Sequence, residues 1–169
     1  MLITEHLLVQ LDREANRSRA VLLQVPEGKY DWQPHERSMK FGYLAELIAI
    51  MPSWIAMQVI MDDLDIRPLD GSTMKPEPLK TSEALVEKLE ATVKEARSAL
   101  AGTSSEHLDT NWQLKEGGKV VQAAARCEMI QDTLNHWAHH RGQMTVYLRL
   151  VGAKVPSTYG PSADEHTFR

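Results

Sequence analysis

The chain has 169 residues, of which 43% are hydrophobic and 25% are charged, and these values are typical of one globular domain (residues 1–169) with a sizeable core. The formal net charge is −4, and no lysine and arginine cluster forms the basic face that nucleic-acid binding needs. Cys127 is the only cysteine, which excludes an intramolecular disulfide. No apolar run reaches the length of a membrane span and no signal-peptide core is present, so we expect a cytoplasmic protein without a membrane partner.

Two helices are predicted in the N-terminal third. Apolar residues recur at helical spacing from Leu7 to Val25, before Pro26. After a polar loop, a second helix is predicted over residues 41–61, with apolar residues on most of its circumference. Such a helix contacts several neighbours or a second subunit. Pro52 should kink or split this helix, because proline removes a backbone donor and clashes one turn back.

The middle of the chain is predicted to contain a long connection and a third helix. Residues 62–80 are rich in proline, aspartate and glycine, which is typical of a loop. Thr81 or Ser82 then caps a helix over residues 82–101, which has a regular apolar face and ends at a glycine.

The last predicted helix covers residues 120–151. Gly117-Gly118 ends a polar segment and is expected to turn the chain into this helix. Strand signals are nearly absent. Four amphipathic helices, with a long crossover between the second and the third, predict an all-α protein with the architecture of a four-helix bundle.

A histidine pair on the last helix is the main candidate site. His136 and His140 are four residues apart, so their rings lie on one helix face, one turn apart. This spacing allows two imidazoles to bind one divalent cation, but it is also typical of two histidines hydrogen-bonded in a polar cleft. His139 is rotated by about 100° from His140 and is expected at the rim. Candidates for a third ligand are His6, His35, His107, His166 and the acidic residues.

Three other polar residues follow the pair on the same helix. Gln143 lies on the histidine face, where it either orients His140 from behind or lines a wet cleft. Tyr147 lies one turn further, either as a proton donor or as a packed side chain with its hydroxyl bonded. Arg141 projects toward the apolar face and is predicted to form an ion pair with an inward carboxylate or to bind a carbonyl.

Several motifs together resemble the DinB/YfiT-like superfamily over most of the chain. They are HWAHHRGQMTVYLRLVGAKVPSTYGPSADE, SMKFGYLAELIAIMPSW, WQPHERSM and the segment from Trp112 to Gly118. The resemblance implies a four-helix bundle, usually a homodimer, with three histidines that hold a divalent metal (zinc or nickel in known members). His136 and His140 match two of these histidines.

The third histidine of the family pattern aligns with Leu47, which has no lone pair. Glu46 is next to it, but its side chain leaves the helix about 100° away and reaches the site only if the Pro52 kink allows it. His35 in the preceding loop is the other substitute. Two histidines with water or a distant carboxylate would bind first-row metals more weakly than three preset imidazoles.

Two functions remain open. The resemblance implies a divalent-metal-dependent (Ni or Zn) enzyme of thiol S-transferase or hydrolase type, in which the metal lowers the pKa of a small-molecule thiol that then attacks an electrophile; here its metal site would be degenerate. The alternative is a metal-free dimer that has lost catalysis and binds a small molecule in its apolar cleft or acts in a stress response. A purely structural dimerisation module would leave the histidine pair without a role.

Overall fold

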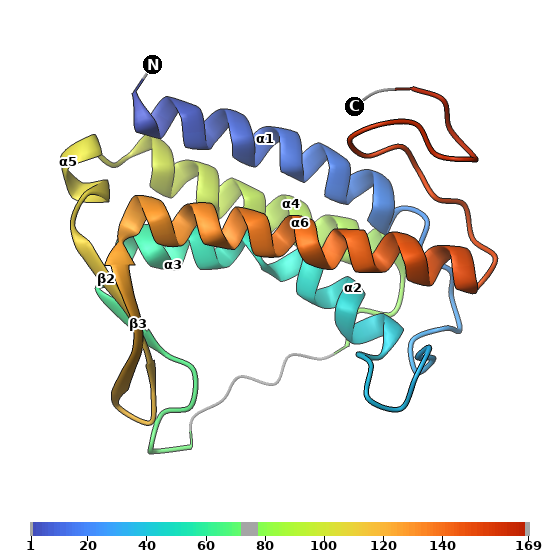
Figure 1. Ribbon diagram of the computed structural model, residues 1–169, viewed down its shortest axis with the longest axis horizontal. Helices are drawn as coiled ribbons and strands as arrows, with labels where there is room; N and C mark the ends of the chain where they lie inside the picture. Colours follow the sequence, from blue (N-terminus) through green and yellow to red (C-terminus); the bar gives the residue numbers. More distant parts are fainter. Residues whose placement is uncertain (1, 72–77, 168–169) are drawn as a thin grey trace.

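The computed structural model describes residues 2–71 and 78–167. Within these residues the protein is mostly helical, with a small sheet at one end of the helices (Figure 1). The elements in chain order are α1 (Ile3–Leu22), α2 (Phe41–Ile50), α3 (Pro52–Ile60), β1 (Asp63–Asp65), α4 (Ser82–Ala101), α5 (Ser105–Leu108), β2 (Asn111–Glu116), β3 (Lys119–Ala125) and α6 (Arg126–Leu150).

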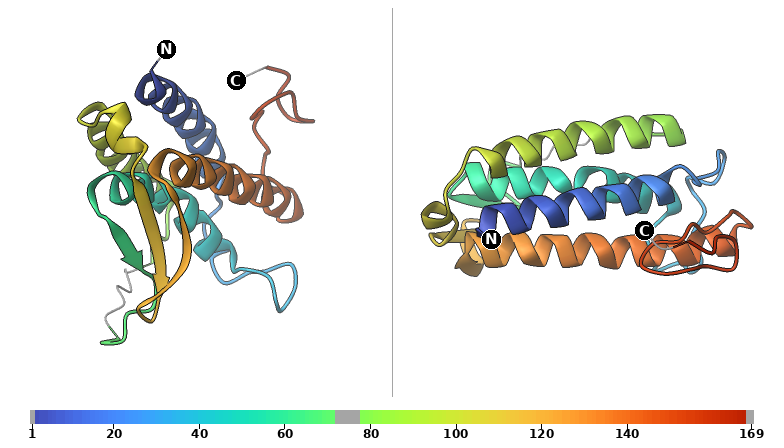
Figure 2. Two further views of the ribbon diagram at one scale, coloured as in Figure 1. Left: turned by 60° about the vertical axis from the view of Figure 1, so that its left-hand side comes forward. Right: turned by 90° about the horizontal axis from the view of Figure 1, so that it is seen from above.

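The long helices run side by side around one apolar core (Figure 2). α1 and α6 run in one direction, and α2, α3 and α4 run in the other (Figure 1). Both α4 and α6 pack against α1, α2 and α3. The core between them consists of fully buried aliphatic and aromatic side chains, among them Leu11, Leu44, Ile48, Ile55, Leu89, Ile130, Trp137 and Leu148.

Pro52 splits the second predicted helix, as expected, into α2 and α3, which meet at a bend of 41°. Proline has no N–H for the carbonyl of Ile48, one turn back. The indole N–H of Trp137 on α6 donates to that carbonyl instead, at 2.8 Å, and the hydroxyl of Thr92 on α4 donates to the carbonyl of Ala49 at 2.7 Å. The neighbouring helices therefore satisfy the backbone at the break.

Among the helices that the structure describes, none alone is long and apolar enough to cross a membrane. Only α2 and α3 taken together, across their bend, would meet that criterion of length and composition.

The sheet corrects the all-α expectation. β1 pairs with β2 in parallel, and β2 pairs with β3 antiparallel. Residues 120–125 were expected to begin the last helix, which in fact begins at Arg126. Gly117 and Gly118, with φ of 57° and 77°, form the two-residue turn of a β-hairpin. The alanines at the end of β3 favour a helix locally, but pairing with β2 decides their conformation.

Arg126 joins the sheet to the helices. Its guanidinium is buried and donates to the carbonyls of Gln58 and Met61 at the end of α3, at 2.7 and 2.5 Å. These carbonyls have no partner within their own helix, so the arginine caps α3 from outside. On the other side, the carboxylate of Asp65, the last residue of β1, accepts a hydrogen bond from the backbone N–H of Gly118 at 2.6 Å. The hairpin is therefore held at both of its ends.

The C-terminal segment is fixed to α1 and α6 by a buried ion pair. Arg141 is fully buried and pairs with the carboxylate of Glu14, which is the ion pair expected from the sequence. Arg141 also donates to the hydroxyl of Ser18 at 3.0 Å and to the hydroxyl of Tyr159 at 2.5 Å. Tyr159 in turn donates to Glu14 at 2.8 Å. The segment after α6 is therefore packed against the helices at this point.

Candidate ligand site beside the paired histidines

The two histidines of the predicted pair lie in contact in the middle of α6. Their Nε2 atoms are 2.7 Å apart, and the ring centroids are 4.5 Å apart. His140 is buried, with 4% of its surface exposed, whereas His136 is exposed. The helical spacing of four residues produces this contact directly.

Gln143 determines how the pair is protonated. Its side-chain oxygen lies 2.8 Å from Nδ1 of His140. An amide oxygen only accepts, so His140 carries its proton on Nδ1 and presents a lone pair on Nε2. His136 must then donate from Nε2 to His140. Gln143 thus orients His140 from behind, which is one of the two roles expected from the sequence.

The pair favours a neutral His136. Partial burial of its ring beside Trp54 and His140 lowers the pKa of His136 below its ordinary value, and the nearby rings of His140 and His139 lower this pKa further. A neutral His136 that donates from Nε2 keeps Nδ1 as a hydrogen-bond acceptor.

A three-histidine metal centre does not fit these residues. Two imidazole nitrogens bound to one tetrahedral zinc ion at about 2.0–2.1 Å would lie about 3.3 Å apart, which is longer than the 2.7 Å between the Nε2 atoms of this hydrogen-bonded pair. A third ligand is missing, because the described residues contain no group of three His, Cys, Asp or Glu side chains that could hold a metal ion. Leu47, at the family's third position, is a core side chain with 8% of its surface exposed.

Glu46 and His35, the two residues considered as a third ligand in place of Leu47, make contacts away from the histidine pair. Burial raises the pKa of Glu46, and the charge of Lys88 on α4 partly offsets this rise. The Nδ1 atom of His35 accepts the backbone N–H of Arg37 within an exposed loop, at 3.1 Å.

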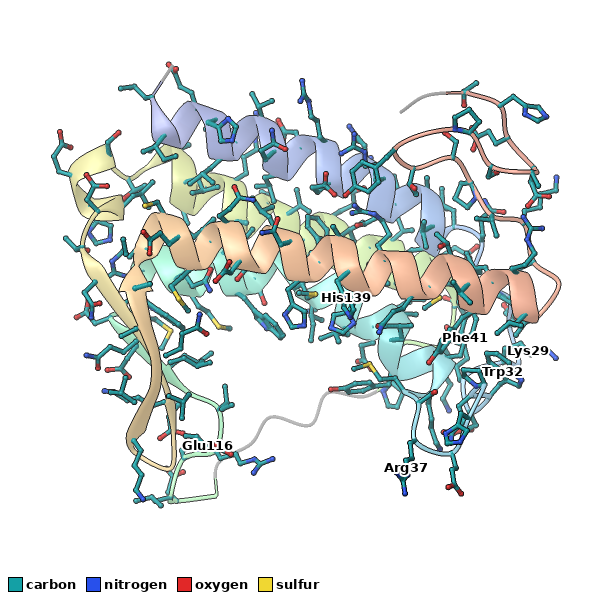
Figure 3. The ribbon with its side chains drawn as sticks, viewed as in Figure 1. Lys29, Trp32, Arg37, Phe41, Glu116 and His139 are labelled. Atoms are coloured by element: carbon teal, nitrogen blue, oxygen red, sulfur yellow. The ribbon has the colours of Figure 1, made fainter. Side chains whose placement is uncertain are left out.

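The contacts of His139 and Tyr147 indicate which of the roles expected for them fits the structure. His139 is exposed, with its ring centroid 5.1 Å from that of His140, and it borders the pair as a rim residue (Figure 3). The hydroxyl of Tyr147 donates to the carbonyl of Met39 at 3.2 Å. Its ring packs edge-on against Trp32, with centroids 5.6 Å apart. Tyr147 therefore has the contacts of a packed side chain.

A cavity of about 530 Å³ adjoins His136 and lies between α3, α6 and one face of the sheet. Trp54 stands beside the histidine, with ring centroids 5.9 Å apart. The cavity is mainly apolar, which is typical of sites for small organic ligands. Its lining residues are Trp54, Gln58, Leu64, Ile66, Trp112, Leu114, Gln122, Met129, Asp132, Thr133 and His136.

Sequence reasoning missed this cavity because it missed the sheet. Leu64, Ile66, Trp112 and Leu114 come from the strands and their ends, and they form the wall opposite the helices. The available signal was Gly117-Gly118 between two short runs of strand-forming residues, which is typical of a hairpin.

Known proteins share the sequence pattern and the fold of this chain. A model of the DinB family matches residues 1–167. The crystal structure of a DinB-like protein from Bacillus subtilis superposes with a TM-score of 0.68 at 15% identity, over 96% of this chain and 99% of that one. A DinB-like protein from Bacillus cereus ATCC 10987 gives a TM-score of 0.71 at 18% identity, over 92% and 97%. At these identities the structures show a common fold.

A curated relative matches over a shorter stretch. The uncharacterized protein YrdA of Bacillus subtilis (strain 168) is 53% identical over 46 residues. The match covers 27% of this chain and 28% of that protein.

Proposed function

The chain belongs to the DinB family, and from that premise we propose that it is a small-molecule-binding member of the family. The ligand occupies the cavity between α3, α6 and the sheet, and the imidazole of His136 contacts it at the edge of the cavity. The observation that carries this proposal is a mainly apolar cavity of about 530 Å³ with a histidine on its lining.

The proposal includes the architecture expected from the family. α1, the bent pair α2 and α3, α4 and α6 form a four-helix bundle in one domain, with a long crossover between α3 and α4. Since α3 and α4 run in the same direction, they are related by a crossover and not by a tight turn. We further propose a cytoplasmic homodimer. Light scattering of the purified chain tests the dimer, and a mass of one chain at all concentrations would contradict it.

The histidine pair supplies the polar contact in this function. The Nε2–H of His136 donates a hydrogen bond to His140. Nδ1 of His136 can therefore accept a hydrogen bond from the ligand. The amide of Gln143 fixes His140, so this acceptor is held in place before the ligand arrives, which reduces the ordering cost of binding.

Probe binding with two matched arginine variants tests the cavity. The probe is prodan, a neutral naphthyl ketone that fluoresces at shorter wavelength in apolar surroundings. Ile66 lines the cavity and Val120 lies on β3 outside the lining, and each is 50% exposed. We expect Ile66→Arg to weaken prodan binding roughly tenfold or more, because a charge enters the apolar site. Val120→Arg should bind as the wild type does.

The probe experiment has two outcomes against the proposal. Wild-type protein that shows no saturable prodan binding has no functional cavity of this kind. An equal loss in both arginine variants would place the binding elsewhere on the sheet.

A second candidate function is the divalent-metal-dependent thiol S-transferase or hydrolase, with nickel or zinc as the metal. It is favoured by the converging Nε2 atoms of His136 and His140 and by the support that Gln143 gives to His140. The metal would supply Lewis acidity toward a thiol. Only two side chains of the described residues would hold it.

Metal analysis distinguishes the two candidates. Protein made without a histidine tag, in medium supplemented with nickel and zinc, is expected to contain far less than one metal ion per chain. Leu47→His should raise the affinity for Ni²⁺ or Zn²⁺ by roughly a hundredfold or more, because it completes a three-imidazole set. Adding His140→Gln should abolish the gain. Stoichiometric metal in the wild type would favour the enzyme, and an unchanged affinity in Leu47→His would contradict the placement of the third ligand.

A further inference from the structure

The lining of the cavity indicates which class of molecule it accepts. Its walls carry the side chains of Trp54 and Trp112, together with Leu114 and Met129. Indole rings offer large flat apolar surfaces that pack well against other aromatic rings. The cavity is therefore suited to a flat, mainly apolar ligand.

The buried part of the cavity differs from its mouth. Gln58, Thr133 and Trp112 are buried, whereas Asp132 and Gln122 are exposed. The amide of Gln58 and the hydroxyl of Thr133 are hydrogen-bonded, with N···O and O···O distances of 2.9 and 3.1 Å. An amide nitrogen carries two N–H groups, so Gln58 retains a donor when it is paired with Thr133. Polar groups therefore lie deep in an otherwise apolar site.

Trp112 adds a second donor. Its Nε1–H is buried and has no hydrogen-bond partner among the described residues, and the residue as a whole is only 2% exposed. A buried donor without a partner is rare and costs free energy. Both residues line the cavity, so a hydrogen-bond acceptor on a ligand that packs against them would give the spare N–H of Gln58 and the N–H of Trp112 a partner.

The charges on the lining exclude an anion. None of the described residues that line the cavity is a lysine or an arginine. The carboxylate of Asp132 lies at the mouth. A carboxylate or phosphate on the ligand would find no cation and would be repelled by Asp132, so burial of its charge would not be compensated.

We infer that the ligand of this cavity is a neutral aromatic molecule with a carbonyl-type acceptor on the part that enters the cavity. The carbonyl oxygen is bound among Gln58, Thr133 and Trp112, and the aromatic body lies between the apolar walls. This inference rests on the proposed small-molecule function and adds the chemical class of the ligand.

Three naphthalenes of nearly equal shape test the inference. They are 2-acetylnaphthalene, which has a carbonyl, 2-ethylnaphthalene, which lacks it, and 2-naphthoate, which is an anion. Their affinities are measured by displacement of prodan at neutral pH. We expect the ketone to bind about fivefold or more tightly than the hydrocarbon, which is the gain typical of one net hydrogen bond. The anion should bind most weakly.

Two variants locate the donors. Trp112→Phe and Gln58→Met each remove a polar group while keeping an apolar side chain in the wall. Both should bring the ratio of the affinities for 2-acetylnaphthalene and 2-ethylnaphthalene close to one. The affinity for 2-ethylnaphthalene should change little, and its binding also shows that the variant is folded. The matched control is Trp32→Phe, because Trp32 packs against Tyr147 outside the cavity. It should keep the full preference.

The outcomes separate this inference from the function on which it rests. If none of the three naphthalenes displaces prodan and prodan itself does not bind, the proposed function fails. If all three bind equally, or 2-naphthoate binds most tightly, the cavity is a ligand site but the ligand class is wrong. A preference that persists in both donor variants would likewise overturn the assignment of the carbonyl position.

Discussion

The side chains of His136, His140 and Gln143 act as one unit, because each fixes the proton of the next. The oxygen of Gln143 holds a proton on Nδ1 of His140, and the remaining lone pair of His140 accepts from His136. Nδ1 of His136 takes no part in this hydrogen-bond chain, so it is the position at which a further proton would be taken up. The neutral state of His136 follows from partial burial of its ring and from the nearby rings of His140 and His139, which lower its pKa.

The pKa of His136 gives a test at this scale. Since its pKa in the folded protein is lowered from 6.5, the unfolded chain takes up the proton first as the pH falls. Acidification from about pH 7.5 to about pH 5.5 should therefore reduce the free energy of unfolding. We expect the His136 ring proton to titrate below 6.5 by NMR.

Two variants serve as controls for this prediction. His140→Gln removes one of the rings that lower the pKa, so the titration midpoint of His136 should move upward. His136→Gln should lose part of the acid sensitivity of unfolding. A wild-type midpoint at or above 6.5 would contradict the neutral pair.

Among the elements, the break between α2 and α3 depends on a side chain from another helix. The carbonyl of Ile48 loses its helical partner at Pro52 and accepts the indole N–H of Trp137. Trp137 lies next to His136 on α6, so the contact that stabilises the bend is adjacent to the candidate site.

A double-mutant cycle tests this compensation. Trp137→Phe should lower the free energy of unfolding by about 1–3 kcal/mol in the wild-type background, because the carbonyl of Ile48 is left unpaired. In a Pro52→Ala background the new N–H can bond that carbonyl, so the same substitution should cost less. Urea unfolding of the four proteins measures the coupling. Equal costs in both backgrounds would show that the indole hydrogen bond is not what replaces the lost donor.

The helices could be predicted because their signals are local. The third predicted helix, over residues 82–101, has the bounds of α4, and the hydroxyl of Thr81 caps it by accepting the N–H of Ala84. The break at Pro52 follows from its missing donor. β3 could not be recognised in the same way, since its alanines become strand only by pairing with β2.

Only the part of the candidate site that lies on α6 was predictable from the sequence. The spacing along one helix brings His136, His140 and Gln143 together. The cavity beside them needs Leu64 and Trp112, which come from the sheet that the sequence-based reading missed. A site on one helix can be read from periodicity, whereas a cavity between distant segments depends on the tertiary fold.

At the scale of the whole molecule, a polar cluster around the buried side chains of Glu14 and Arg141 connects the two ends of the chain. Glu14 of α1, Arg141 of α6 and Tyr159 of the C-terminal segment are mutually bonded. The guanidinium of Arg17 also lies over the ring of Tyr159, at 4.2 Å. Removing one member would leave a buried charge with fewer partners.

Tyr159→Phe tests this cluster without changing side-chain size. It removes the hydroxyl that binds both Arg141 and Glu14, so we expect the free energy of unfolding to fall by about 1–3 kcal/mol. Backbone amides of the C-terminal segment should exchange hydrogen faster. Amides of α4 should change only as much as the free energy of global unfolding does. Tyr43→Phe is the control, because Tyr43 is exposed to nearly the same extent as Tyr159 but lies outside this cluster. Similar effects of both variants would contradict a special role for Tyr159.

The hairpin at one end of the helices has a consequence for how binding specificity can change. β2 and β3 supply one wall of the cavity, whereas the core lies between the helices and the histidine pair lies on α6. Replacing residues of the hairpin, or exchanging it for the hairpin of a relative, would alter the ligand with little change to the core. Engineering of the hairpin can thus test the proposed ligand site while the helical core stays as it is.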